Sequence, residues 1–172
     1  MITALNLAAK IFKCKPVAMP KDMIIEKSVA INKNIETVFS YLKQTRNQDN
    51  FSVWNMKDPG MKKTYSGTDG TKGFIYSWDS TDKNVGAGAQ EIKGITDNSR
   101  IDYELRFERP MKNTGRSSFI VNKISDNETS VTWNFISPTK FPFSLITPIF
   151  RKMLGKQIET SLQNLKALLE KQ

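Results

Sequence analysis

The chain has 172 residues, of which 38% are hydrophobic and 10% aromatic, so it can bury a core as one domain and does not have the composition of a disordered protein. It contains no histidine and one cysteine, Cys14, which excludes histidine-based catalytic triads, cysteine-rich zinc sites and an intramolecular disulfide framework. The formal net charge of +9 favours acidic partners, but the basic residues are scattered and no nucleic-acid-binding motif occurs, so we expect no nucleic-acid partner.

Residues 1–22 are predicted to be an N-terminal appendage to a domain that spans residues 23–172. The apolar stretch near the start is interrupted by Asn6 and Lys10 and is too short to cross a membrane. Lysines follow this stretch rather than precede it, which does not suit a secretory signal, so we expect a cytoplasmic protein. Residues 1–15 are compatible with a short amphipathic helix that has a basic end. Such a segment more often packs on its own domain or on a neighbouring chain, and peripheral contact with an anionic membrane is the alternative.

The first part of the domain has the pattern of one strand followed by two short helices. Ile24–Ile31 is rich in Ile and Val and is predicted to form the first strand. Asn34 suits the N-cap of the next helix, because its side chain can accept a hydrogen bond from the first helical turn. Residues 47–54 are predicted to form a second short helix that ends near Trp54.

Six further segments alternate apolar with polar residues, which is the period of a strand with one buried face. They are Met61–Ser66, Phe74–Asp79, Val85–Ile95, Arg100–Glu108, Ser117–Ile124 and Thr129–Ser137. Their apolar members are mostly aromatic, so the sequence predicts a broad sheet with one aromatic face. Gly86 and Gly88, inside one of these strands, predict a bulge or tight curvature.

After the last strand the apolar spacing changes to that of a helix. The helix is predicted over Pro148–Lys171, with Thr147 as its cap and Pro148 at its first position. Gly155 lies inside this helix, so either the helix bends there or another element approaches its backbone closely. The preceding segment Phe141-Pro142-Phe143 is interpreted either as the gate of an internal cavity or as packing for the end of the helix.

This order of elements predicts an α+β fold in which a curved antiparallel sheet of about seven strands wraps around a long C-terminal helix. A single helix covers only part of so broad an aromatic face. The uncovered part is a natural lining for an internal apolar cavity, which is the main indication of function.

Several local sequences form an ordered set along the chain. They are Ile25–Asn32, Val38–Leu42, Tyr76-Ser77-Trp78, Gly86-Ala87-Gly88, Phe107-Glu108-Arg109-Pro110, Val131-Thr132-Trp133 and Gly155–Leu165. This set resembles the polyketide cyclase/dehydrase branch of the START-like, Bet v 1-like (SRPBCC) superfamily over residues 23–170, and the fold of that superfamily is called helix-grip. The resemblance implies a cavity for a hydrophobic ligand between the sheet and the closing helix. Relatives include aromatase/cyclases, lipid carriers, hormone receptors, ubiquinone-binding proteins and activators of a chaperone ATPase, so the fold alone does not select an activity.

Inward-facing aromatic and polar residues are the candidates for ligand binding. Tyr76, Gln90 and Tyr103 are predicted to orient a ligand, because each adds a polar group to the apolar side of its strand. The predicted cavity walls are Trp78, Phe119, Trp133, Phe150 and Met153, of which the last two are expected to face the sheet from the closing helix. Ordinary core packing is the alternative for these residues.

No catalytic residue is predicted. Asp102, Glu104 and Glu108 alternate with the apolar residues of their strand and are expected to face water. Without histidine or an obvious inward carboxylate, no acid–base pair is evident, although Glu91 or Asp79 inside the cavity would supply one. No metal site, redox cofactor or phosphate-binding glycine loop is indicated.

The sequence therefore predicts a protein that binds a hydrophobic or amphipathic small molecule, such as a lipid, a polyketide or an isoprenoid-like compound. One alternative is an enzyme of the polyketide cyclase or dehydratase type, since enclosure of a reactive chain favours ring closure. Another is an interaction module, either a chaperone co-regulator or a basic membrane-surface protein. The state of assembly, monomer or homodimer, is left open.

Overall fold

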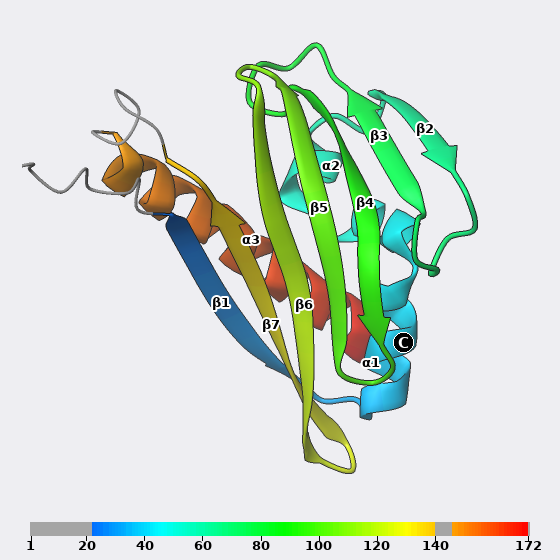
Figure 1. Cartoon of the computed structure of the whole chain (residues 1–172). Helices are drawn as coiled ribbons and strands as arrows, with labels where there is room; N and C mark the ends of the chain where they lie inside the picture. Colours follow the sequence, from blue (N-terminus) through cyan, green and yellow to red (C-terminus); the bar gives the residue numbers. More distant parts are fainter. Residues whose placement is uncertain (1–21, 140–145, 172) are drawn as a thin grey trace, which may run out of the picture.

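The computed structural model describes residues 22–139 and 146–171 of the 172-residue chain. Its elements in chain order are β1 (Met23–Ile31), α1 (Ile35–Lys43), the 3₁₀ helix η1 (Thr45–Asn50), α2 (Val53–Lys57), β2 (Lys62–Ser66), β3 (Ile75–Asp79), β4 (Ala87–Thr96), β5 (Arg100–Arg109), β6 (Asn113–Ser125), β7 (Glu128–Ser137) and α3 (Thr147–Glu170). Figure 1 shows the strands in one sheet, with α3 running alongside β1.

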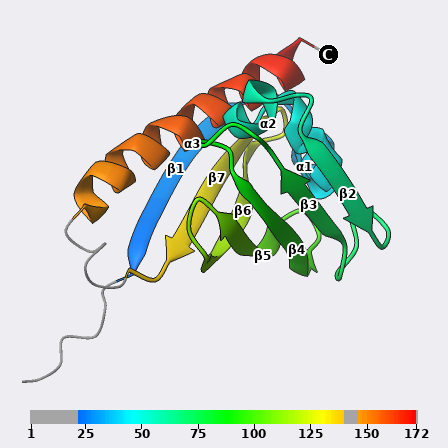
Figure 2. The same cartoon turned by 90° about the horizontal axis from the view of Figure 1, so that it is seen from above.

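The sheet has seven antiparallel strands in the order β1-β7-β6-β5-β4-β3-β2, so β1 and β2 are its edges. Figure 2 shows that the sheet is strongly curved and that α3 and α2 lie on its concave side. The long helix packs mainly on β1, and α1 packs on β6 and β7. The predicted α+β helix-grip architecture, with a seven-stranded curved sheet and a long C-terminal helix, is confirmed.

Local signals in the sequence account for several of these elements. The Asn34 side chain accepts a hydrogen bond from the Thr37 backbone N–H at 2.8 Å and so caps α1 as predicted. The alternating residues Ile101 and Tyr103 in β5 are buried on the concave face, as are Val131 and Trp133 in β7. The period of two therefore fixes which side chains face the helices.

Three expected boundaries are wrong. The single short helix over residues 47–54 is instead η1 and α2, separated where buried Phe51 turns inward. The last hairpin begins earlier than expected, because β6 starts at Asn113 and includes residues that had the composition of a loop. The helix α3 begins at Thr147, so Thr147 lies in its first turn and Ile146 occupies the capping position.

Some expectations concern residues outside the described ranges. Residues 1–21, which make up nearly all of the expected appendage, and the segment Phe141–Phe143 belong to this group, so their predicted roles remain predictions. Within the described ranges, no helix is both long and apolar enough to span a bilayer.

Two glycines mark close approaches between elements. A Cβ on Gly155 would lie 3.7 Å from Cγ2 of Ile25 and 3.6 Å from Cε of Lys27, so β1 approaches the helix backbone closely there. A Cβ on Gly88 would lie 2.7 Å from Cζ2 of Trp78 and 2.6 Å from the Arg106 carbonyl oxygen. The expected irregularity at this point is confirmed, because the β4–β5 register shifts between Ala87 and Gly88.

These two glycines are expected to respond in opposite directions to the same substitution. Gly155→Ala should raise the free energy of unfolding by about 1 kcal/mol, because its Cβ meets its neighbours at ordinary contact distances and alanine favours the helix. Gly88→Ala should lower it by about 1–3 kcal/mol, because the added methyl group overlaps backbone and ring atoms. Urea unfolding of both variants tests the pair, and a loss of stability in Gly155→Ala would contradict the packing described at that helix.

Candidate functional site

The strand residues predicted to bind a ligand share the concave face of the sheet. They are Tyr76 on β3, Gln90 on β4, Tyr103 on β5, Phe119 on β6, Trp133 on β7 and Trp78 on β3. Tyr76 is directly opposite Gln90, and Phe119 is directly opposite Trp133. The structure therefore brings these six residues onto one surface. One part of this surface is buried under other elements, and the other part is only half-buried.

One part of the concave face is closed. Phe51, between η1 and α2, is fully buried and its ring centroid lies 6.3 Å from those of Phe119 and Trp133. The rings of Phe119 and Trp133 are 4.7 Å apart, and Trp54 packs edge-on against Trp133 at 6.2 Å. We call Phe51, Trp54, Phe119 and Trp133 the closed cluster. Phe119 and Trp133 thus act as core residues, which is the alternative that the sequence left open.

The other part of the face remains half-buried. Phe107 lies between Trp78 and Phe135, with edge-to-face ring contacts at 6.1 Å and 6.4 Å, and Leu105 precedes it on the same side of β5. All four side chains are only partly shielded from solvent. We call Trp78, Leu105, Phe107 and Phe135 the open aromatic face. It is an apolar surface that α3, lying along β1, leaves without a complete cover (Figure 2).

Phe150 and Met153, the cavity walls predicted on α3, are not packed into the core. Their side chains are exposed by 44% and 47%. Gly155 approaches β1, whereas Phe150 and Met153 precede Gln157 by seven and four residues and share its side of the helix, where Oε1 of Gln157 is buried. Their expected role as cavity walls therefore stays a prediction.

Two of the predicted polar groups are buried without a hydrogen-bond partner. These are Nε2 of Gln90 and the hydroxyl group of Tyr103, and their side chains are 7% and 3% exposed. The Tyr103 hydroxyl lies near Thr45 and Gln48, but without good hydrogen-bond geometry, and burial raises the pKa of Tyr103. On α3, Oε1 of Gln157 is also buried and unpartnered, and the sequence reasoning did not nominate it. Each unsatisfied buried polar atom is costly, so these three atoms call for a hydrogen-bond partner that the described side chains do not supply.

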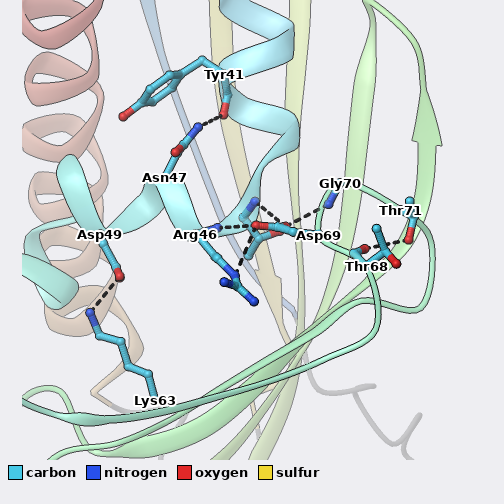
Figure 3. Close-up of polar contacts among 10 residues, drawn as sticks. Tyr41, Arg46, Asn47, Asp49, Lys63, Thr68, Asp69, Gly70 and Thr71 are labelled. Carbon is cyan, nitrogen blue, oxygen red and sulfur yellow. Dashed lines mark hydrogen bonds and ion pairs between the residues drawn. The ribbon is translucent and has the colours of Figure 1, made fainter.

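Tyr76, in contrast, is held by a polar network that the sequence reasoning missed. Nδ2 of Asn55 donates to the Tyr76 hydroxyl at 3.2 Å and to the Asp49 carboxylate at 2.6 Å. Lys63 forms an ion pair with Asp49 at 2.9 Å, and Figure 3 shows these two side chains facing each other. Burial, followed by the charge of Asp49, raises the pKa of Tyr76, so its hydroxyl stays protonated at neutral pH. The one sequence signal for this network is the alternation in β2, which places Lys63 on the concave side.

A second polar cluster fixes η1, and with it the closed cluster. The Asp69 carboxylate, in the loop between β2 and β3, accepts hydrogen bonds from the backbone N–H groups of Thr45 at 2.8 Å and Arg46 at 3.1 Å (Figure 3). It also accepts one from the Gly70 N–H at 2.8 Å. Asp69 therefore satisfies the first N–H groups of η1 from a distant part of the chain, as a capping residue does.

The carboxylates that would favour acid–base catalysis face away from the concave side. Glu91 pairs with Arg106 at 2.9 Å and with Lys93 at 3.0 Å, and the hydrogen bond from Arg106 is the main cause of its lowered pKa. Asp79 forms an ion pair with Arg109 and is largely exposed. Neither residue supplies an acid inside the fold, and no group of three or more possible metal ligands occurs among the described residues.

A comparison of the sequence with models of protein families shows to which family the chain belongs. A family model described as polyketide cyclase / dehydrase and lipid transport matches residues 23–170. The chain belongs to this family. The resemblance predicted from the sequence is therefore confirmed. No curated protein matches the chain significantly.

Solved structures share the fold of this family member at low sequence identity. The Aha1 dimer from Colwellia psychrerythraea matches with a TM-score of 0.60 and 14% identity over 86% of this chain and 96% of the other. A protein from Thermus thermophilus matches with a TM-score of 0.63 and 12% identity, over 85% and 96%. The di-domain aromatase/cyclase StfQ of the steffimycin biosynthetic pathway matches with a TM-score of 0.65 and 11% identity, over 87% of this chain and 51% of StfQ. At these identities the likeness concerns the fold alone.

The chemical groups on the concave side limit what this surface can do. The described strand positions there carry mainly aromatic and aliphatic side chains, with Gln90, Ser117 and Lys63 among the polar ones, and no carboxylate. Such a surface can bury a flat or chain-like apolar molecule and direct a few hydrogen bonds to it.

The role of Asp69 predicts an effect on stability and on local opening. Asp69→Ala should lower the free energy of unfolding by about 1–2 kcal/mol, because two N–H groups of η1 lose their acceptor. Amide hydrogen exchange in residues 45–51 should become faster in the same variant. Asp126→Ala is the matched control, since Asp126 is 90% exposed and pairs with Lys123 at the surface. Equal effects of the two substitutions would contradict this role of Asp69.

Proposed function

We propose that this protein binds a hydrophobic or amphipathic small molecule on the open aromatic face, with the Gln90 amide as the polar contact. The observation that carries the proposal is the buried, unpartnered Nε2 of Gln90. Gln90 lies between Tyr76 and Leu105 in a cross-strand row, next to the half-buried rings of Trp78 and Phe107. An apolar surface and a free hydrogen-bond donor therefore adjoin each other.

The chemistry of this surface indicates the class of ligand. An unsatisfied buried donor costs about 1–3 kcal/mol, which a ligand carbonyl, hydroxyl or carboxylate oxygen would recover. Burial of apolar ligand surface against the rings contributes about 25 cal/mol per Å². The preferred ligand is thus a lipid, a polyketide or an isoprenoid-like compound with an oxygen acceptor. The family description, which names both polyketide cyclases and lipid transport, agrees with this class.

A second candidate function is the cyclisation of a bound polyketide chain. The Tyr76 hydroxyl, kept protonated by burial and anchored by Asn55, is a donor that could polarise a substrate carbonyl. Enclosure in one folded conformation would supply most of the rate enhancement. The absence of an inward carboxylate among the described strand positions makes this candidate secondary to binding.

Substitution of Gln90 distinguishes a ligand contact from a packing role. Gln90→Leu should raise the melting temperature, because it removes an unsatisfied buried donor, and it should weaken binding of an acceptor-bearing ligand about five- to ten-fold. A suitable pair of probes is 2-acetylnaphthalene and 2-ethylnaphthalene, which share a ring system and differ in the carbonyl acceptor. Titrations followed by tryptophan fluorescence should show that Gln90→Leu binds 2-acetylnaphthalene more weakly than the wild type does and binds 2-ethylnaphthalene equally well.

Controls make this test specific to the open aromatic face. Gln163→Leu removes an exposed glutamine from α3 and should leave the affinity for both probes unchanged. Trp78→Ala should weaken both probes about ten-fold or more, because it removes a ring from the apolar floor. Wild-type affinity in both Trp78→Ala and Gln90→Leu would overturn the proposed site.

A further inference from the structure

The first turns of α3 carry a stripe of exposed apolar side chains. Ile146 precedes the helix and is 40% exposed, and Ile149, Phe150 and Met153 are 72%, 44% and 47% exposed. Their spacing of three, one and three residues places them on one side of the helix. We call these four residues the α3 apolar stripe. A stripe of this size is unusual on a surface that meets only water.

Two cations, Lys152 and Lys156, border this stripe. Arg151 is two residues from both Ile149 and Met153, so it points to the opposite side of α3. Arg151, Lys152 and Lys156 are exposed, and within residues 22–139 and 146–171 none of them forms an ion pair. The nearby acidic residue Glu159 is already paired with Lys27 at 3.1 Å. Arg151, Lys152 and Lys156 line a surface groove of about 710 Å³ between α3 and the edge strand β1, together with Glu26 and Glu159. The first half of α3 therefore combines protruding apolar groups with unpaired positive charge.

The charge selects among possible occupants of this surface. A second copy of the chain carries a net charge of +9 and would repel the cations. The chain's own N-terminal segment contains Lys10, Lys13, Lys15 and Lys21, so it would also place like charges together. An anionic occupant with an apolar interior fits both features, and a bilayer that contains anionic lipids has this character.

We propose that the first two turns of α3 dock on the surface of an anionic membrane. The α3 apolar stripe would enter the interfacial layer, while Lys152 and Lys156 contact lipid phosphates. Figure 1 shows that β1 begins beside the start of α3. The inference is independent of the proposed ligand site, because docking requires no bound ligand.

Flotation of the full chain with lipid vesicles tests this docking. The protein should float with vesicles of phosphatidylcholine that contain one third phosphatidylglycerol, and much less with pure phosphatidylcholine, and added salt should weaken the binding. Lys152→Glu/Lys156→Glu should weaken binding to the anionic vesicles about ten-fold or more. Ile149→Ser/Phe150→Ser should weaken it while the net charge stays the same.

The matched control is Lys72→Glu/Lys83→Glu, which changes the net charge equally at exposed sites on other elements and should float almost as the wild type does. Melting temperatures check that all variants are folded. Equal losses in the control and in Lys152→Glu/Lys156→Glu, or unchanged flotation of Ile149→Ser/Phe150→Ser, would overturn the proposal. Failure of the wild type to float with anionic vesicles would also overturn it and would favour an acidic protein as the partner of these cations.

Discussion

The packing of Phe51 against Phe119 and Trp133 is the contact on which the rest of the concave face depends. It brings η1 and α2 down over one part of the aromatic face and turns that part into core. Asp69 holds η1 in position from the loop between β2 and β3. These short helices cover only the closed cluster. Trp78, Phe107 and Phe135 lie outside the area that they cover and stay half-buried. The position of the Phe51 ring thus determines which aromatic residues belong to the closed cluster and which belong to the open aromatic face.

Stability and binding make opposite demands at Gln90. An apolar residue there would match its neighbours Tyr76 and Leu105 and would spare the protein an unsatisfied donor. Polar groups that a fold leaves unpaired tend to occur where another molecule completes them. Tyr103 shows a related arrangement deeper in the fold, next to Thr45, whose hydroxyl oxygen is also buried and unpartnered.

Much of the fold could be predicted from the sequence because a period of two assigns each strand residue to a face. This is why Tyr76, Gln90 and Tyr103 were correctly expected on the concave side. The same pattern carries no information on which helix covers which residues, so the core role of Phe119 and the half-exposed state of Phe135 became clear only from the packing. Phe150 shows a related limit, since helical spacing groups it with Gln157 on one side of α3 but does not say how far other elements cover that side.

The polar contacts were the least predictable part of the site. Asp49 and Lys63 are separated by fourteen positions and meet only because β2 folds back toward η1. Asp69 contacts Thr45 of η1 across twenty-four positions. No local pattern reports such pairs, whereas the cap at Asn34, which acts on its own helix, was evident from the sequence.

Native mass spectrometry of the freshly purified chain is the most direct test of the central claim, that an incompletely covered aromatic surface holds a small apolar molecule. The predicted result is a fraction of protein whose mass exceeds that of the bare chain by one extractable lipid or aromatic compound, and this fraction should disappear in Trp78→Ala. A bare chain in every preparation, with no change in melting temperature across a panel of lipids and polyketides, would contradict the account.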